Sequence, residues 1–275
     1  MDTAAPPAAA EPGAATDLDA AARAFRADGA VVLRGLFAAH VEALRAGVAA
    51  NMADPGPHAA ENVAPGEGGR FFDDYCNWRR IPAFEAAARD PAVVAAAAAL
   101  MGSRTVRLFH DHVLVKEPGT ARATPWHQDG PYYFVEGRQT VSFWVPLDPV
   151  TDASLRLVAG SHRWPRPVLP TRWANADPFF PSGDYAPVPD PDAEGMRVLE
   201  WAMAPGDAVA FSFDALHGAR GNASAARRRA FSLRLVGDDA RYVERPGPTS
   251  PPFPGHGMRP GDALRDDWFP LVGGA

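Results

Sequence analysis

Six short segments with the composition and alternation of β-strands follow one another between residues 104 and 236. We expect strands over Arg104–Lys116, Gln139–Leu147, Ser154–Val158, Met196–Met203, Asp207–Phe213 and Arg228–Val236. Helical patterns dominate the first hundred residues, and runs of strands after runs of helices are typical of an α+β fold. The strand pattern by itself leaves a β-sandwich, a barrel and a jelly roll open.

The part of the chain before residue 104 predicts helices over residues 17–28, 38–53 and 91–101, with a short strand over Ala30–Leu33. The first helix can be capped by Asp17 or Thr16, and the third follows the helix-start signal Asp90-Pro91. Residues 1–16, rich in alanine and proline, are predicted to be a disordered tail. Residues 17–275 are predicted to form a single domain, for which 47% hydrophobic residues supply an ample core.

Two proline- or glycine-rich stretches without regular period, Asp54–Gly69 and Pro165–Gly195, are predicted to be long loops. Such loops are commonly active-site lids or disordered segments. The second contains the aromatic residues Trp173, Phe179, Phe180 and Tyr185, which either anchor the loop to the core or contact a substrate. We expect both loops to border the mouth of a site and to become ordered when ligands bind.

The charge balance excludes some partners. A formal net charge of −6 and a pI near 5.7 argue against a nucleic-acid-binding protein. The single cysteine, Cys76, excludes an intrachain disulfide and agrees with a reducing compartment. The first residues lack the regions of a secretory signal, and the alanine run Ala95–Ala99 is too short to span a bilayer. We therefore expect a cytoplasmic protein without a membrane partner.

A His-x-Asp pair lies in the segment Thr124-Pro125-Trp126-His127-Gln128-Asp129-Gly130. In an extended strand, residues i and i+2 point to the same side, so His127 and Asp129 can reach one metal ion while Gln128 points away. Two polar surface residues near a turn give the same pattern, so this spacing alone does not establish a metal site.

A third ligand is offered by His217, which follows the apolar strand expected over Asp207–Phe213. Two histidines and one carboxylate on one face of a metal leave other positions open, an arrangement that suits non-haem Fe(II) oxygenases. Eleven residues later Arg228 opens the last expected strand, whose alternation puts Arg228, Ala230 and Ser232 on one face.

These residues resemble the phytanoyl-CoA dioxygenase family of Fe(II)- and 2-oxoglutarate-dependent oxygenases. The resemblance covers most of the chain and includes, besides the metal motif and His217-Gly218, the segments Gly29–Phe37, Trp144–Asp148 and Leu157–Trp164. It implies a double-stranded β-helix core, which is a cupin-like jelly roll, with the N-terminal helices packed on its major sheet. It also implies Fe(II) as the metal, with 2-oxoglutarate and O2 as cosubstrates.

By position, the resemblance assigns the iron ligands to His127, Asp129 and His217. It assigns the distal carboxylate of 2-oxoglutarate to Arg228, whose planar guanidinium can fork onto a carboxylate. Its rivals Arg227 and Arg229 would point to the opposite face of the strand. The family spacing and the small neighbours Ala230 and Ser232 favour Arg228.

Further cosubstrate contacts are expected from Trp144, Ser142 and His112. Trp144 matches an aromatic position beside the cosubstrate, and Ser142 shares its strand face. His112 and His110 could form a second metal site, but they are also suited to supply a hydrogen bond or to be ordinary structural histidines. Many relatives have a hydroxyl where this chain has Ala219, so binding is expected to depend more on Arg228 or on another donor.

Candidate substrate contacts are polar and aromatic residues near the metal motif and before the third helix, each of which also has an ordinary packing role: Asn77, Trp78, Arg79, Trp126, Tyr132 and Arg156. They fit a small polar substrate better than a long acyl chain.

The sequence thus predicts an enzyme that hydroxylates a C–H bond of a small molecule and converts 2-oxoglutarate to succinate and CO2. The alternatives are a noncatalytic metal-binding jelly roll that senses a ligand, and desaturation or another oxidative outcome. In related halogenases a small residue replaces the carboxylate, so Asp129 favours oxygen insertion over halogenation.

Overall fold

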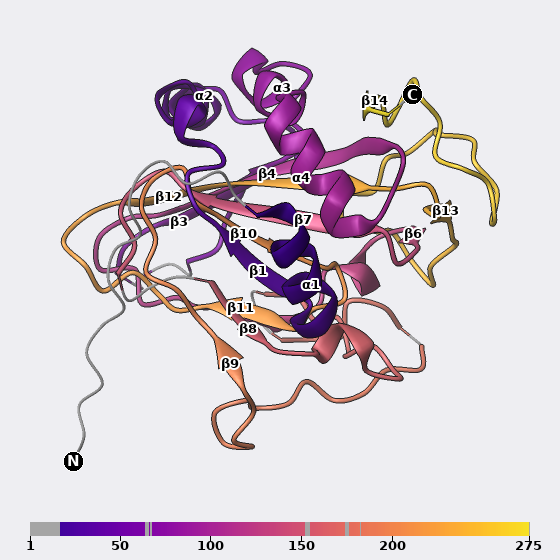
Figure 1. Cartoon of the computed structure of the whole chain (residues 1–275). Coiled ribbons are helices and arrows are strands. Elements are labelled where there is room, and N and C mark those ends of the chain that lie inside the picture. The colour runs from indigo at the N-terminus through magenta and orange to yellow at the C-terminus, as the bar shows by residue number, and fades with distance from the viewer. Residues whose placement is uncertain are drawn as a thin grey trace.

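The structure, a computed structural model, describes residues 17–63, 66, 68–151, 155–173, 176–181 and 183–274. The tail predicted over residues 1–16 lies outside the described residues. Two antiparallel sheets face each other, and helices cover the outer side of the larger sheet (Figure 1). This is an α+β jelly roll with the helices on its major sheet, as expected from the sequence.

The predicted helices lie close to their expected positions: α1 (Leu18–Asp28), the 3-10 turn η1 (Ala38–His40) with α2 (Val41–Ala53), and α4 (Pro91–Met101). A further helix, α3, spans Pro82–Ala88. Asp17 caps α1 by accepting from the Ala20 amide at 2.9 Å, and Asp90 caps α4. The seven-residue helix α3 was not predicted. It buries Phe84 against Phe231 of the sheet, with ring centroids 4.8 Å apart, and so helps fix the helical layer on the sheet.

The larger sheet has the strand order β1-β10-β7-β12-β4-β3-β2, with β14 paired to β4. Its strands are β1 (Ala30–Leu33), β2 (Ala60–Glu61), β3 (Phe71–Tyr75), β4 (Val106–Lys116), β7 (Thr140–Pro146), β10 (Ala208–Phe211), β12 (Arg228–Val236) and β14 (Leu271–Gly273). Strand β12 agrees with its prediction residue for residue. Strand β2 lies within Asp54–Gly69, which was expected to be loop throughout, because it pairs with the unpredicted β3.

The smaller sheet has the order β5-β11-β8-β9 and consists of β5 (Thr124–His127), β8 (Leu155–Val158), β9 (Val198–Leu199) and β11 (His217–Ala219). The prediction of a strand over Met196–Met203 was too long, because Met203 leaves β9 and bridges Val150 instead. Two short strands, β6 (Val135–Glu136) and β13 (Arg241–Tyr242), form a separate pair, and η2 (Gly130–Tyr132) and η3 (Ser161–Arg163) are 3-10 turns. The Pro165–Gly195 loop contains no helix or strand among its described residues.

The space between the sheets is filled by two apolar clusters. One contains Trp144, Leu157 and Phe211, and the other contains Phe109 and Phe213. The candidate site lies where these clusters meet the inner faces of the strands. Among the described residues, no helix combines the length and the apolar composition that crossing a membrane requires.

Candidate metal centre and adjoining cavities

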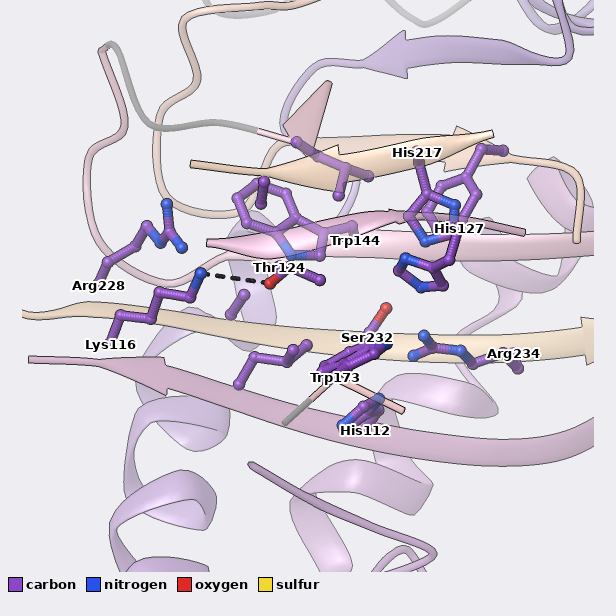
Figure 2. A pocket seen from close by; sticks show the side chains of 15 residues that line it. His112, Lys116, Thr124, His127, Trp144, Trp173, His217, Arg228, Ser232 and Arg234 are labelled. Carbon is purple, nitrogen blue, oxygen red and sulfur yellow. Dashed lines mark hydrogen bonds between the residues drawn. The ribbon is translucent and has the colours of Figure 1, made fainter. Parts of the chain in front are cut away.

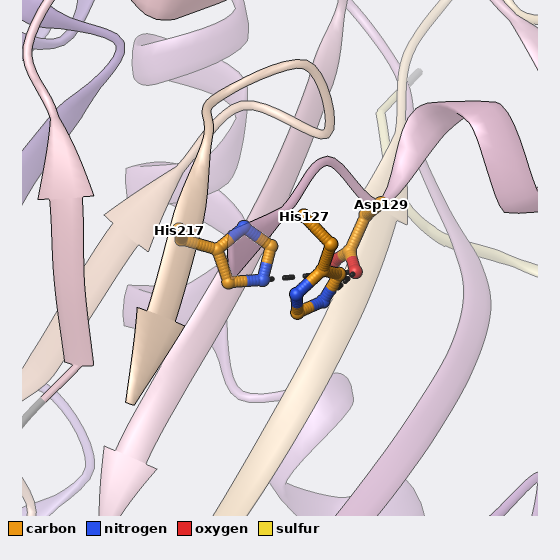
Figure 3. Close-up of side chains that lie close together, drawn as sticks. All are labelled: His127, Asp129 and His217. Atoms are coloured by element: carbon orange, nitrogen blue, oxygen red, sulfur yellow. Dashed lines mark ion pairs between the residues drawn. The ribbon is translucent and has the colours of Figure 1, made fainter. Parts of the chain in front are cut away.

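The three predicted metal ligands converge between the sheets (Figure 3). His127 ends β5 and His217 begins β11, and the two residues are direct partners in the strand pairing. The Nε2 atoms of His127 and His217 lie 3.6 and 3.8 Å from Oδ1 of Asp129. One ligand atom from each residue lies within 4.8 Å of the others, and all three side chains are buried.

Asp129 reaches this point by a route other than the predicted one. It follows the end of β5 in a helical conformation, with φ −69° and ψ −42°, at the start of η2. The expectation that one extended strand presents both His127 and Asp129 was therefore wrong, because the chain turns at Gly130-Pro131. Gln128 does point away, as expected. It donates to the carbonyl oxygen of Asp214 at 2.5 Å and accepts from the amide of Val168 at 2.8 Å.

Both imidazoles are arranged to offer a lone pair. Nδ1 of His127 lies 2.8 Å from the carbonyl oxygen of Pro125, and Nδ1 of His217 lies 3.0 Å from that of Ala215. A carbonyl only accepts, so each Nδ1 carries the proton and each Nε2 is free to bind a metal. Burial, and then the neighbouring His127, lowers the pKa of His217 to about 3, which keeps this ring neutral.

Asp129 is held as a carboxylate by two side chains. Its Oδ2 atom accepts from Ser142 Oγ at 3.2 Å and from Arg234 Nη2 at 3.4 Å. Burial alone would raise the pKa of Asp129, but the charge of Arg234 holds it well below its usual range. Two imidazoles that present Nε2 and one ionised carboxylate are a donor set that fits Fe(II). Ser142, predicted to contact the cosubstrate, contacts this carboxylate.

A narrow cavity, called here the inner cavity, runs from the two histidines to Lys116 and Arg228 (Figure 2). Trp144 and His112, which were expected to contact a cosubstrate, line it together with Arg228. Arg229, on the opposite face of β12, pairs with Asp148, and its Nη2 lies 2.6 Å from the carboxylate. Arg227 is half exposed and pairs with Glu117. Of the three rival arginines, only Arg228 lines the inner cavity.

The far end of the inner cavity holds two basic side chains, Lys116 and Arg228. Lys116 Nζ donates to the carbonyl oxygens of Arg122 and Arg220 and to Thr124 Oγ1, at 2.9, 3.3 and 3.2 Å. Burial, and then the charges of Arg228 and Arg122, lowers the pKa of Lys116 to about 6, and burial lowers that of Arg228 to about 10. An anion at this end would stabilise the charged forms of both side chains.

Trp173, from the Pro165–Gly195 loop, separates this cavity from a larger one. Its ring centroid lies 5.1 Å from that of His127 and 6.4 Å from that of His112. With Trp173 in this place the inner cavity has a volume of about 30 Å³. That is space for about two water molecules. A five-carbon dicarboxylate therefore needs Trp173 to move.

The larger cavity, called here the outer cavity, has a volume of about 390 Å³ and also reaches His127 and Asp129. Its lining comes from strands, from the loop after residue 165 and from the C-terminal segment, and it is both aromatic and polar: His58, Asn62, Asp73, Tyr75, His110, His112, Tyr132, Tyr133, Arg172, Trp173, Phe179, Arg234 and Ser250. His112 Nε2 lies 2.9 Å from Asp73 Oδ2. This volume is within the range of small-molecule sites.

Of the predicted substrate contacts, only Tyr132 lines the outer cavity. Trp78 packs among the helices on the other side of the major sheet, with Arg79 stacked 4.3 Å from its ring centroid, and Asn77 accepts from Arg80.

The other two candidates lie on the minor sheet. Arg156 stacks 5.2 Å from the ring centroid of Trp126 and forms an ion pair with Asp192. All of the candidate substrate contacts except Tyr132 therefore pack outside both cavities.

Sequence reasoning missed Lys116 and Arg234, and it named Trp173 only as one of several loop aromatics. The signal for Arg234 was present, because it continues the alternation of Arg228, Ala230 and Ser232 along β12. Lys116 is the register partner of Arg228, which only the strand pairing reveals. The position of Trp173 depends on the path of an irregular loop.

Comparisons with known proteins agree with this geometry. A family model described as phytanoyl-CoA dioxygenase (PhyH) matches residues 25–230, most of the chain, as the sequence resemblance predicted. A search of curated proteins found no significant match.

Several solved structures share the fold. The epimerase SnoN from nogalamycin biosynthesis, solved with Fe3+, alpha ketoglutarate and nogalamycin RO, is 23% identical with a TM-score of 0.74, covering 93% of this chain and 98% of that one. The carbocyclase SnoK of the same biosynthesis is 23% identical with a TM-score of 0.73, covering 95% and 100%. EctD from S. alaskensis, solved with 2-oxoglutarate and 5-hydroxyectoine, is 23% identical with a TM-score of 0.66, covering 88% and 84%.

Proposed function

Because the chain belongs to the phytanoyl-CoA dioxygenase family, we propose that it is an Fe(II)- and 2-oxoglutarate-dependent oxygenase that hydroxylates a C–H bond of a small molecule. The observation that carries this proposal is the pairing of two features in one cavity. Two buried histidines, which have the carboxylate of Asp129 beside them, lie at one end, and the two buried basic side chains of Lys116 and Arg228 lie at the other. A metal flanked by an anion site fits a cosubstrate with a carboxylate at each end.

In this proposal His127, Asp129 and His217 hold the iron, with Nε2 of each histidine and Oδ1 of the carboxylate as donors. Iron with 2-oxoglutarate and O2 supplies the oxidising chemistry that an unactivated C–H bond requires. The protein supplies placement. Ser142 and Arg234 fix the orientation of Asp129 through its other oxygen.

The distal carboxylate of 2-oxoglutarate is assigned to Arg228 and Lys116. Arg228 offers a planar fork, and Lys116 offers a compact ammonium held beside Thr124. Many relatives have a hydroxyl where this chain has Ala219, so a further donor was expected. We propose that Lys116 is this donor. Trp144 borders the same cavity, and Trp173 covers it and excludes water once cosubstrate is in place.

The outer cavity is the proposed substrate site, because it reaches His127 and Asp129 from the other side of Trp173. Hydroxylation is the outcome we propose for this substrate. Asp129 occupies the position that a halogenase leaves to halide, which argues against chlorination. A noncatalytic ligand sensor is disfavoured, because metal binding alone has no use for Lys116 and Arg228 at the far end of the inner cavity.

A succinate-release screen tests the proposal. The protein is supplied with Fe(II), 2-oxoglutarate and O2 and offered small amines, phosphonates, acyl thioesters and hydroxylated ring compounds. We expect one class to stimulate succinate formation and to gain one oxygen atom, with no chlorinated product in chloride buffer. Succinate formation without oxygen gain would indicate another oxidative outcome. The proposal would be contradicted if succinate release were the same with and without every compound and were also the same in the Asp129→Ala variant.

A further inference from the structure

Two buried polar atoms in the outer cavity have no hydrogen-bond partner among the described residues. They are Nη1 of Arg234 and Nε2 of His110, whose residues are direct partners on β12 and β4. Arg234 is 5% exposed and His110 is 2% exposed, so both side chains are withdrawn from bulk solvent. Buried polar atoms in native proteins are normally paired, so two neighbouring exceptions that line a cavity indicate a missing ligand group.

Arg234 can only donate. Its Nε donates to the hydroxyl oxygen of Tyr133 at 3.1 Å, and its Nη2 donates to Asp129 Oδ2 at 3.4 Å. A guanidinium has no acceptor atom, so the remaining nitrogen, Nη1, requires an acceptor. Because Arg234 also contacts a proposed metal ligand, the group that satisfies Nη1 is held close to the metal centre.

His110 offers the opposite polarity. Its Nδ1 lies 3.0 Å from the carbonyl oxygen of Asp111, so Nδ1 carries the proton. Burial, and then the charge of Arg234, holds the pKa of His110 well below its ordinary value, so the ring is neutral. Its Nε2 is therefore an acceptor that requires a donor. The ring is fixed by edge contacts with Tyr133 and Tyr75, at centroid distances of 5.2 and 6.2 Å.

We propose that Arg234 and His110 together bind a hydroxyl group of the substrate. The hydroxyl oxygen accepts from Arg234 Nη1, and the hydroxyl proton is donated to His110 Nε2. This inference rests on the proposed function, in which the outer cavity receives the substrate. A carboxylate would satisfy Arg234 but would face the lone pair of His110, and an ether or ketone would leave His110 unpaired. A hydroxyl satisfies both atoms.

The walls of the outer cavity indicate the rest of the substrate. Tyr132 and Phe179 meet at a centroid distance of 5.1 Å, and His58 stacks on Tyr75 at 4.7 Å with an angle of 8° between the rings. All four residues line the cavity. Flat aromatic walls favour a ring. The substrate class is therefore a hydroxylated ring compound whose hydroxyl lies beside the metal centre.

Calorimetric titration of the metal-free protein with matched probes tests this assignment. Benzene, naphthalene and anthracene rings are each used with four substituents: hydroxyl, methoxy, carboxylate and carboxamide. In the ring size that fits, we expect the hydroxyl compound to bind about 10-fold more tightly than the methoxy compound, because only the hydroxyl donates to His110. His110→Phe should remove this difference by weakening the binding of the hydroxyl compound alone. Arg234→Gln should weaken the binding of the hydroxyl and methoxy compounds alike.

His256→Phe is the matched control, because His256 also packs against aromatic rings, those of Tyr242 and Phe134, and does not line the outer cavity. It should leave all affinities unchanged. The inference is overturned if no ring size favours the hydroxyl compound, or if the carboxylate or carboxamide binds most tightly. The comparison of probes on the unmodified protein stands even if a variant fails to fold. Since no turnover is measured, failure here and failure of the succinate screen are separate results.

Discussion

The two cavities on either side of Trp173 are built in different ways. The inner cavity is lined almost entirely by strands of the two sheets, with Trp173 as the contribution of a loop. The outer cavity takes much of its lining from the β2–β3 hairpin, from residues 171–173 and 179, and from Ser250-Pro251 in the C-terminal segment. Strands fix side chains through backbone pairing, whereas loops vary and move more readily. The contrast separates a fixed site, which we propose for the metal and cosubstrate, from an adaptable site, which we propose for the substrate.

Replacing Asp129, a proposed metal ligand that lines the outer cavity, should have the largest effect. Asp129→Ala removes the only carboxylate of the donor set and leaves Arg234 without its anionic partner. We expect Fe(II) affinity to fall by about 100-fold or more and turnover to be lost. Metal titration of both proteins measures the change. Asp214→Asn, at a largely buried carboxylate outside the metal centre, is the control, and unchanged metal affinity in Asp129→Ala would contradict the assignment.

The Arg228→Ala substitution tests whether the inner cavity is the cosubstrate site. It should weaken the binding of 2-oxoglutarate by roughly 10-fold to 1000-fold, because a bidentate charged contact is worth about 2 to 4 kcal/mol. Metal binding and probe binding in the outer cavity should not change. The matched control is Arg229→Ala, next to it on the opposite face of β12. If the defect appeared in Arg229→Ala and not in Arg228→Ala, the assignment from strand register would be wrong.

Lys116 gives the cosubstrate site a pH dependence. Its pKa in the free protein is about 6, so it is mostly neutral at pH 7 to 8. A carboxylate beside it raises this pKa, so binding takes up a proton. Affinity for 2-oxoglutarate should therefore fall as pH rises above 6, by at most about 10-fold per pH unit. Calorimetry in buffers of different ionisation enthalpy measures the uptake. Lys116→Met should abolish it, and proton uptake that survives this substitution would refute the role of Lys116.

The loop that carries Trp173 should show the smallest effect. Because the inner cavity holds only about 30 Å³ with Trp173 in place, the proposed binding of cosubstrate there requires Trp173 to move. We expect hydrogen exchange in residues 165–195 and 54–69 to slow by a few-fold when 2-oxoglutarate and a ring probe are bound. Exchange in β12 should change little. Equal exchange of both loops with and without ligands would remove the distinction between the fixed and adaptable sites.

The same contrast explains what the sequence could predict. The family resemblance assigned roles to His127, His217 and Arg228, and strand alternation, a local property, separated Arg228 from its neighbours. Arg234 needed only one further step along β12. Lys116 could not be placed, because its contact with Arg228 depends on the pairing of β4 with β12. Asn77 and Trp78 were misplaced because polarity and aromaticity do not reveal on which side of a sheet a loop packs. The outer cavity depends on the paths of loops, which sequence periodicity does not encode.

The central claim is that the His127, Asp129 and His217 set and the Arg228 end bind Fe(II) and 2-oxoglutarate together. Anaerobic titration of 2-oxoglutarate into the Fe(II)-loaded protein, followed by visible absorption, tests it most directly, because a 2-oxo acid that chelates Fe(II) gives a charge-transfer band. We predict a saturable band in the unmodified protein and in Arg229→Ala. It should be weaker at equal ligand concentration in Arg228→Ala and absent in Asp129→Ala. Fe(II) bound to the unmodified protein with no band at saturating 2-oxoglutarate would contradict the account.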